Sequence, residues 1–509
     1  MPIRELPERP NLEHLKKQAR NLLRDAQASE KDALARFAAW NIALPAKLAD
    51  ALHVLAREHG FETWPELKLR IEMSSGDPAE ALSAAIKSDK AEQVREVLKR
   101  HAALKTRINE PLPNYDFDMP AIVAAAGRQN REVVDALLDF GANVDERTRW
   151  WAGSFGVLDM ANEELARHLI ARGARVDIHA AARLNMPDRV QALLAEDPKL
   201  VHARGGDGQM PLHFAATVEI ASALLEAGAE IDARDIDHES TAAQYMASIA
   251  PHRHEVARFL ISRGAKADIM MAAAIGDLAL TERILNDDPD TTKTTVTERY
   301  FPKENPKSGG SIYIYGFGWT MSPHMLAHRF GHPEVFALLM QRSAPWLRLV
   351  NAAEVGDEAY FQQILKSHPQ VVKKLSLNVR RIIGVATRSN TRALQWLLAA
   401  GWPAAPAMEN GQTALHFAAW HGNVEMVRAL LAHKAPVNVF ETEHGGSPLG
   451  WALHGSLHSW MREKGDYPAV ARALLGAGAE IPRPERPLEA TEEVLEIIRQ
   501  HKPKIPGKT

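Results

Sequence analysis

The chain has 509 residues, which is more than one ordinary hydrophobic core supports, so several domains or a repeat array are expected. Its 46% hydrophobic and 25% charged residues are typical of a folded protein. Lys and Arg number 61 against 64 Asp and Glu, and the formal net charge of −3 disfavours nucleic acid or an anionic membrane as partner. The chain has no cysteine, which excludes disulfides, thiolate nucleophiles and Cys-ligated zinc.

The first residues lack the apolar segment of a signal peptide. No stretch reaches the roughly 18 consecutive apolar residues that a membrane helix needs. The lack of cysteine fits a reducing compartment. We therefore expect a cytoplasmic protein that does not contact a membrane.

The N-terminal segment, residues 1–75, carries helical patterns of apolar residues. In the first of them the apolar side chains fall on one helix face: Leu12, Leu15, Ala19, Leu22 and Leu23. The net charge of this segment is close to zero, which does not favour nucleic-acid binding. We expect a small helical module that covers the exposed hydrophobic face at the start of the segment after residue 75.

From residue 78 onward, one phrase recurs along the chain. It reads Leu-Leu or Leu-Ile, two variable residues, Gly-Ala and, after two further residues, Asp or Asn. Its copies begin at Leu137, Leu169 and Leu224, and looser copies begin at Leu260, Leu397, Leu430 and Leu474. A second phrase precedes some copies, as MPLHFAA at Met210–Ala216 and TALHFAAWHGNVEMVRALL at Thr413–Leu431. Such self-similarity indicates a solenoid of repeated helical pairs.

Together these phrases resemble the ankyrin repeat, whose signature is Thr-Pro-Leu-His-x-Ala with a period of about 33 residues. The resemblance implies an all-α ankyrin-repeat solenoid, in which His213 and His416 hydrogen-bond between neighbouring finger turns. Ala-Ala allows the paired helices to approach closely, Leu-Leu forms the buried stripe of the second helix, and Gly supplies the left-handed residue that ends it. The N-terminal module is similar to a short helical module that precedes ankyrin arrays in some bacterial proteins.

The repeats are of two kinds. Standard units are interspersed with short-fingered ones, in which the chain passes from an Asp almost directly into the next helix, as at 176–198 and 267–289. Counting both kinds, about twelve helical pairs are expected between residues 78 and 481. Residues 482–509 are expected to form a last helix followed by a disordered tail.

The segment 290–320 interrupts the repeat pattern. It is rich in β-branched and aromatic residues around Pro and Gly. This composition predicts an extended finger, a β-hairpin with its tip at 307–310. Loops of a repeat array emerge on one face, which is often the binding face.

Histidines at His324, His328 and His332 have the spacing of metal ligands on a helix face. No Glu follows His324, so the His-Glu-x-x-His pattern of metalloproteases is absent. We interpret these histidines as packing and capping residues. The spacing of Asp232, Asp235 and Asp237 resembles a calcium loop, although acidic finger tips are usual in the resembled family. No metal, cofactor or catalytic residue is predicted.

Aromatic and histidine side chains gather in the last two repeats, where Gly450 replaces the signature His and the unit is too long. The candidate partner-binding residues are Trp319, Trp420, His421, Trp451, His454, His458 and Trp460. Exposed Trp is typical of a binding hot spot. Alternatively, these rings fill the lengthened turn.

We predict an adaptor or scaffold that binds a protein or peptide partner in the concave groove of the array. A second hypothesis is a hydrolase or metal-dependent enzyme that uses the C-terminal His/Trp cluster, with Asp466 or Glu463 as the acidic partner. A third is a spacer without a specific partner, which predicts a groove lacking an aromatic patch. The sequence does not name the partner.

Overall fold

The computed structural model describes residues 4–7, 10–73, 77–373, 375, 380–482 and 488–501. Within these residues the regular structure is helical, and the β-type pairing amounts to four isolated bridges, such as Arg234 with Thr241. The expected all-α solenoid class is confirmed. The proposed tail at 502–509 lies outside the described residues.

The described chain divides into two compact units. The first comprises Met1–Ala243, Ser262–Ala265 and Asn305–Gly309, and the second comprises Gln244–Ile261, Lys266–Glu304 and Gly310–Thr509. Each unit has its own buried apolar core.

The first unit opens with a helical module built around small and aliphatic residues. Asn11 caps its first helix by accepting a hydrogen bond from the N–H of His14, and Ala19 and Leu22 are buried one turn apart. The buried carboxylate of Glu58 is held by two hydrogen bonds from Arg36, at 2.7 and 2.8 Å. The helices of the module are α1 (Leu12–Gln27), α2 (Lys31–Ala38), α3 (Leu48–Glu58) and α4 (Trp64–Met73).

The remaining helices of the first unit are short and paired. They are α5 (Pro78–Lys87), α6 (Ala91–Arg100), α7 (Leu104–Arg107), α8 (Ala121–Gly127), α9 (Arg131–Asp139), α10 (Val157–Met160), α11 (Glu163–Ala171), α12 (Ile178–Arg183), α13 (Pro187–Glu196), α14 (Pro211–Phe214) and α15 (Val218–Glu226). The 3-10 helices η1 (Pro198–His202) and η2 (Gly206–Gly208) lie between α13 and α14.

The second unit continues the same construction. Its helices are α16 (Ala242–Ser248), α17 (His254–Ser262), α18 (Ile269–Ile275), α19 (Leu278–Asp287), the 3-10 helix η3 (Pro289–Lys293), α20 (Tyr313–Gly316), α21 (Pro323–Arg329), α22 (Pro333–Arg342), α23 (Pro345–Val355), α24 (Glu358–Ser367), α25 (Arg381–Thr387), α26 (Thr391–Ala399), α27 (Ala414–Trp420), α28 (Val424–Ala432), α29 (Pro448–His458), α30 (Tyr467–Gly476) and α31 (Glu492–Gln500). The first two residues of α16, Ala242 and Ala243, and the last residue of α17, Ser262, are assigned to the first unit.

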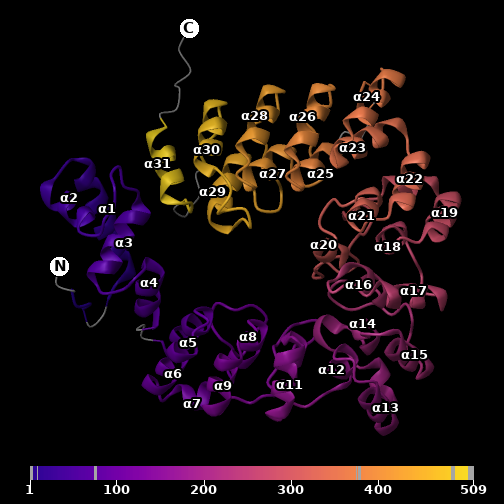
Figure 1. Ribbon diagram of the computed structural model, residues 1–509, viewed down its shortest axis with the longest axis horizontal. Helices are drawn as coiled ribbons and strands as arrows, with labels where there is room; N and C mark the ends of the chain where they lie inside the picture. The colour runs from indigo at the N-terminus through magenta and orange to yellow at the C-terminus, as the bar shows by residue number, and fades with distance from the viewer. Residues whose placement is uncertain are drawn as a thin grey trace. The chain divides into compact units, whose positions relative to one another are not determined.

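Within the second unit, helices stack in two rows. Helices α25, α27 and α29 form one row and α26, α28 and α30 the other (Figure 1). In the first row Ala418, Ala419 and Ala452 are fully buried, because small side chains permit close helix approach. In the second row Leu430 and Leu474 are fully buried in the same core.

The second helix of many pairs ends at a glycine in the left-handed region. Gly228 has φ of 96°, and Gly478 has φ of 92°. At the matching position of α28 stands Lys434, with φ of 63°. The expected role of the repeated glycine is therefore confirmed, and Lys434 adopts the same conformation with a side chain that disfavours it.

The short-fingered units form as expected at two places. Asp177 caps α12 by accepting a hydrogen bond from the N–H of Ala180, and Asp268 caps α18 through the N–H groups of Met270 and Met271. The acidic residue that ends one unit is thus the N-cap of the next helix, which leaves no room for a finger between them.

The signature histidines link consecutive fingers. His213 Nδ1 accepts a hydrogen bond from the N–H of Met210 at 3.2 Å, and its Nε2 lies 3.1 Å from the carbonyl oxygen of Ser240 in the following finger. His416 makes the same pair of contacts, with the N–H of Thr413 and the carbonyl of Gly446. These contacts need a neutral imidazole, because Nδ1 must accept while Nε2 donates.

The hairpin predicted at 290–320 is wrong. The segment contains η3, a series of turns and α20, with no strand. Its apolar residues enter the core instead of alternating across a ribbon: Val296 and Tyr313 are fully buried. The Tyr313 hydroxyl donates a 2.8 Å hydrogen bond to Asp268, and its ring stacks on Phe317 at 4.9 Å.

No helix in the described part of the chain combines the length and the apolar composition that spanning a bilayer requires.

Replacing Gly478 by Ala should lower the free energy of unfolding by about 1–2 kcal/mol, the cost of a side chain in the left-handed region. An added Cβ at Gly478 meets no atom within 4 Å, so the cost is conformational only. Lys434→Gly is the matched change and should not lower stability. Urea unfolding of both variants checks this, and an unchanged midpoint for Gly478→Ala contradicts it.

Stability should fall as the pH drops from about 6.5 to 4. Burial lowers the pKa of His213 to about 4 and that of His324 to about 3, below the value of about 6.5 in an unfolded chain. Protons therefore bind first to the unfolded state, so stability is complete above pH 6.5 and is lost below it. When the pH is lowered from 7.5 to 5.0, the free energy of unfolding of His213→Gln, measured with urea, should fall by about 2 kcal/mol less than that of the parent protein. The exposed control His202→Gln should lose as much unfolding free energy as the parent. An equal loss in all three proteins would contradict the assignment of His213 as a buried neutral imidazole.

Candidate partner-binding site

The aromatic and histidine residues expected to bind a partner come from two adjacent helices of the second unit. Trp420 is the last residue of α27, and His421 follows it as the C-cap. Trp451, His454 and His458 lie three and four residues apart on α29, which places them on one face. Because α27 and α29 pack side by side, these rings meet.

The rings form one connected cluster, which we call the aromatic cluster: Trp420, His421, Trp451, His454, His458 and Trp460. Trp420 lies at its centre, with ring centroids 6.2 Å from Trp451, 5.7 Å from His454 and 6.0 Å from Trp460. His454 and His458 are 4.3 Å apart, and His421 is 5.3 Å from Trp460. Most of these centroids fall in the favourable range for edge-to-face or offset contacts.

Exposure increases across the cluster. His421 is buried at 2%, Trp420 and Trp451 are half-buried, and His454 and His458 are exposed. Trp460 is the most open of the large apolar side chains described, with 70% of its surface in contact with solvent. The cluster therefore has a packed base and an exposed edge.

Trp451 forms part of the packed base. Its ring lies 5.2 Å from His416 and 5.3 Å from Phe417, in contact with the core of the second unit. A Cβ on Gly446 would lie 2.8 Å from the Trp451 ring, so only glycine fits there. This ring therefore fills a gap between neighbouring repeats and not the lengthened turn.

Glu441 supports Trp451 from the neighbouring finger. Burial favours a higher pKa for this carboxyl, but hydrogen bonds from the N–H groups of Gly446, His444 and Glu443 and from the Trp451 side chain outweigh it and hold the pKa of Glu441 below its usual range. The carboxylate is thus charged and fixed, which orients the indole.

The extra residues of the lengthened repeat fold back onto α27. The N–H of Asp466 donates to the carbonyl of Gly422 at 2.9 Å, and the hydroxyl of Tyr467 donates to the carbonyl of Trp420 at 2.8 Å. This folded-back turn carries Trp460 to the edge of the cluster. The unusual length of the repeat is therefore the feature that places the exposed tryptophan.

The hydrolase hypothesis named Asp466 or Glu463 as the acidic partner of the clustered histidines. Asp466 accepts a hydrogen bond from the N–H of Ala469 as the N-cap of α30. In the described chain no ion pair joins Asp466 or Glu463 to His454 or His458. Burial lowers the pKa of His421 to about 4, which makes this imidazole a weak base.

Trp319 does not join the cluster. It is half-buried in the turn that precedes α21. No ring contact connects it to Trp420 or its neighbours among the residues whose placement is described. The insertion and the C-terminal repeats therefore do not form a single aromatic rim through this residue.

The histidines of α21 and α22 do not converge on a metal position. His324 is buried and its Nε2 lies 2.8 Å from the Ser343 hydroxyl oxygen, while His332 Nε2 lies 3.1 Å from the carbonyl oxygen of Ala274. His328 packs its ring 6.0 Å from Phe336. Each of the three imidazole rings contacts a different neighbour, as expected for histidines that pack and cap helices.

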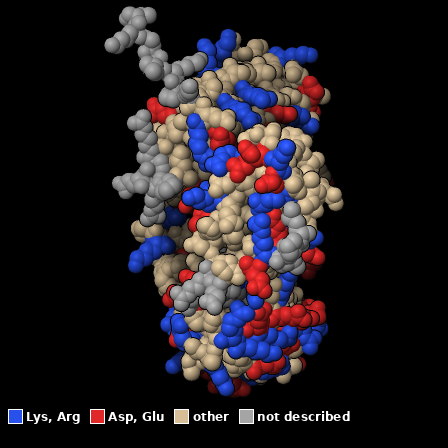
Figure 2. Space-filling view, turned by 90° about the vertical axis from the view of Figure 1, so that its left-hand side faces the viewer, with Lys and Arg blue, Asp and Glu red and all other residues tan. Residues whose placement is uncertain are grey.

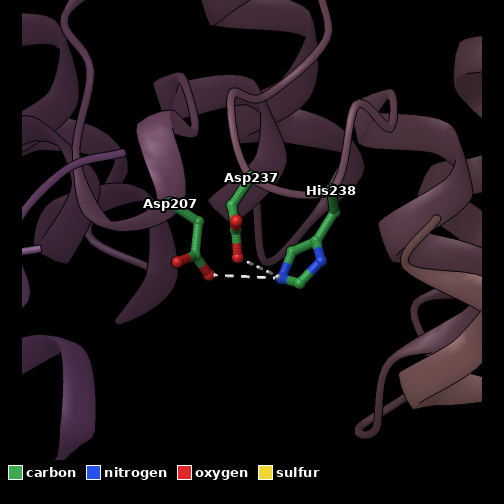
Figure 3. A group of neighbouring side chains, drawn as sticks. All are labelled: Asp207, Asp237 and His238. Carbon is green, nitrogen blue, oxygen red and sulfur yellow. Dashed lines mark ion pairs between the residues drawn. The ribbon is translucent and has the colours of Figure 1, made fainter. Parts of the chain in front are cut away.

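A different group of possible metal ligands lies in the fingers of the first unit. The side chains of Asp207, Asp237 and His238 point toward one another, with ligand atoms within 4.8 Å (Figure 3). His238 Nε2 is 3.5 Å from Asp207 and 3.7 Å from Asp237. Two carboxylates and an imidazole are suitable ligands for a divalent cation.

Sequence reasoning found Asp237 but not its partners, because Asp207 lies one repeat earlier. The backbone carbonyl of Asp207 accepts hydrogen bonds from the N–H groups of Ile236 and Asp237, which stacks the two fingers. Asp237 also accepts from the N–H of Gly309 at 3.1 Å. We interpret His238 as a bridge that holds neighbouring fingers. Asp235 has another task, since it binds the N–H groups of His238 and Ser240.

Charged side chains are mixed on the face that Figure 2 shows. Lys and Arg lie interspersed with Asp and Glu, and no broad area of one sign covers this face. The arrangement agrees with the near balance of charges in the sequence.

Comparisons with known proteins agree with the repeated helical pairs. A family model described as ankyrin repeats in three copies matches residues 178–273, and one described as ankyrin repeats in many copies matches residues 385–431. A mouse protein named ankyrin repeat and SAM domain-containing protein 6 is 32% identical over 120 residues. This match covers 23% of the present chain and 13% of the relative, so the chain matches only a small part of the relative's length.

Replacing Gly455 by Ala should destabilise the protein although alanine favours helix by about 1 kcal/mol. A Cβ at this position of α29 would lie 2.7 Å from the carbonyl oxygen of Trp420, so α27 and α29 must separate. We expect a lower urea midpoint and a shifted tryptophan emission.

Gly476→Ala is the matched control, because no atom lies within 4 Å of its added Cβ. This variant should be neutral or slightly stabilised, with unchanged emission. Equal behaviour of the two variants would contradict the close packing described for α27 and α29.

Proposed function

The chain is an ankyrin-repeat protein, and from this premise we propose that it binds a protein or peptide partner at the aromatic cluster. Ankyrin repeats are generally protein–protein interaction modules. We propose that the partner docks against the exposed edge of the cluster, on the side of the array that the first helices of the repeats and the fingers form.

The observation that carries the proposal is the exposure of Trp460. A tryptophan with 70% of its surface in water leaves a large apolar area unprotected. Tryptophan is also among the residues most enriched in binding hot spots. Next to it, Leu457 is exposed at 38%, and His454 and His458 supply polar groups that a partner can hydrogen-bond.

The packed base of the cluster favours tight docking. Trp420 and Trp451 are held by ring contacts, and the Trp451 side chain also hydrogen-bonds Glu441, so these side chains lose little freedom when a partner binds. An exposed edge on an ordered base is the usual arrangement of a hot spot, in which the surrounding contacts exclude water from the central residues.

The test compares the full-length protein with Trp460→Ala combined with His458→Ala, two exposed positions whose truncation leaves the core intact. Each protein is immobilised and exposed to native lysate, and retained proteins are quantified by mass spectrometry. The best retained candidate is then purified, and its Kd is measured. We expect the double variant to bind it at least about 30-fold more weakly, which corresponds to about 2 kcal/mol.

Trp151→Ala is the matched control, since Trp151 is exposed at 42% but lies in another repeat. This control should retain the same partner with the parent's affinity. If the double variant also keeps that affinity, the aromatic cluster is not the docking site. Trp451 is less suitable for the first test, because its ring packs on the core.

A further inference from the structure

The second unit contains a cavity of about 410 Å³ that has no place in the repeat pattern. Its walls are formed by η3 and the residues up to Tyr300, by Thr320, by the first turns of α25, and by the finger residues Met408 and Glu409. The cavity is thus built where the irregular insertion meets a regular repeat. It is separate from the aromatic cluster.

The lining of this cavity is strongly cationic. Five basic side chains face two carboxylates, those of Asp290 and Glu409: Lys293, Arg299, Arg380, Arg381 and Arg388. The whole chain, by contrast, carries a formal charge of −3. The excess of positive charge is therefore local to this cavity and not a property of the surface.

Three of the five cations are neutralised by neighbouring carboxylates. Lys293 forms an ion pair with Asp290 at 2.7 Å, and Arg380 pairs with Glu409. Arg388 pairs with the buried Glu354 and also donates to the hydroxyl and carbonyl oxygens of Thr320. These contacts hold the wall in place.

Arg381 has no carboxylate within ion-pair distance among the described residues. Its guanidinium donates to the carbonyl oxygen of Lys293. Burial lowers the pKa of Arg381 to about 10, although the nearby Tyr300 and Glu354 act in the opposite direction. Arg299, at the exposed side of the cavity, also lacks an ion-pair partner among the described residues.

Glu354, the carboxylate that attracts Arg381, is already paired with Arg388, so the charge of Arg381 is only partly compensated. An anion in the cavity would lower the cost of burying it. Hydroxyl groups that suit an oxyanion lie in the same wall, on Thr295 and Thr297. Their backbone is fixed by the ladder in which the N–H groups of Val296 and Thr320 donate to the carbonyls of Met321 and Val296, both at 2.9 Å. The donors are therefore arranged before any ligand enters.

We propose that this cavity binds a small molecule that carries phosphoryl groups, with Arg381 and Arg299 as its principal contacts. Guanidinium groups bind phosphate oxygens through paired hydrogen bonds, and a ligand with several phosphoryl oxygens can engage both arginines at once. The volume lies within the usual range for small-molecule sites, about 300–1,000 Å³, and exceeds what inorganic phosphate alone would fill. A pyrophosphate-sized or larger ligand therefore fits the cavity best.

The test titrates the full-length protein with pyrophosphate, inorganic phosphate and a phosphoserine peptide by calorimetry, at ionic strength held constant with sodium chloride. We expect pyrophosphate to bind and to raise Tm, and inorganic phosphate to bind more weakly. Arg381→Gln should weaken pyrophosphate binding at least tenfold. Should that variant fail to fold, Arg299→Gln decides the matter, because its exposed side chain does not support the core.

Arg428→Gln is the control, since this exposed arginine on α28 lies outside the cavity. It should bind pyrophosphate as the parent does, and so should the Trp460→Ala variant, which separates this site from the aromatic cluster. The proposal is overturned if chloride reproduces the effect of pyrophosphate, or if Arg299→Gln keeps the parent's affinity. It is also overturned if Arg428→Gln loses as much affinity for pyrophosphate as the Arg381 and Arg299 variants do. Tighter binding of the phosphoserine peptide than of pyrophosphate would overturn it as well.

Discussion

Close contact between the first helices of successive repeats is the constraint on which this structure depends. Ala418, Ala419 and Ala452 are fully buried, and a Cβ on Gly455 would lie 2.7 Å from the backbone of Trp420. Helices can approach this closely only where small residues face each other, because protein interiors are close-packed. The spacing between α27 and α29 then determines where the rings at their ends meet, and so creates the aromatic cluster.

Hydrogen bonds between fingers fix the direction in which the repeats stack. Each signature histidine accepts from its own finger and donates to the next, as His213 does with Met210 and Ser240. The series changes at Gly450, where no imidazole is present. The helix that contains Gly450, α29, has 11 residues against 7 in α27, and its Ser456 hydroxyl accepts a hydrogen bond from the N–H of Thr491 before α31. The last repeats are therefore held by other contacts.

Both candidate sites occur where the chain departs from the repeat. Regular repeats use nearly every apolar residue for stacking, which leaves few side chains for other tasks. The folded-back turn before Tyr467 presents Trp460, and the insertion at 290–320 forms a wall of the cationic cavity. Local departures from an otherwise consistent pattern are where functional sites are expected. The two surfaces differ in chemistry, one aromatic and one cationic, so they suit different ligands.

The sequence by itself determined the class of fold, the left-handed glycines and the short-fingered units, because these depend on contacts within one repeat or between neighbours. It also predicted that Trp420, Trp451, His454, His458 and Trp460 lie close together, since helical spacing and repeat adjacency suffice for that. The tertiary structure decided what local patterns cannot. Segment 290–320 packs Val296 and Tyr313 into a core instead of pairing as strands, because burial and the Asp268 hydrogen bond outweigh strand propensity. Likewise, Arg299 and Arg381 lie far apart in sequence and share a cavity only because the insertion folds against α25.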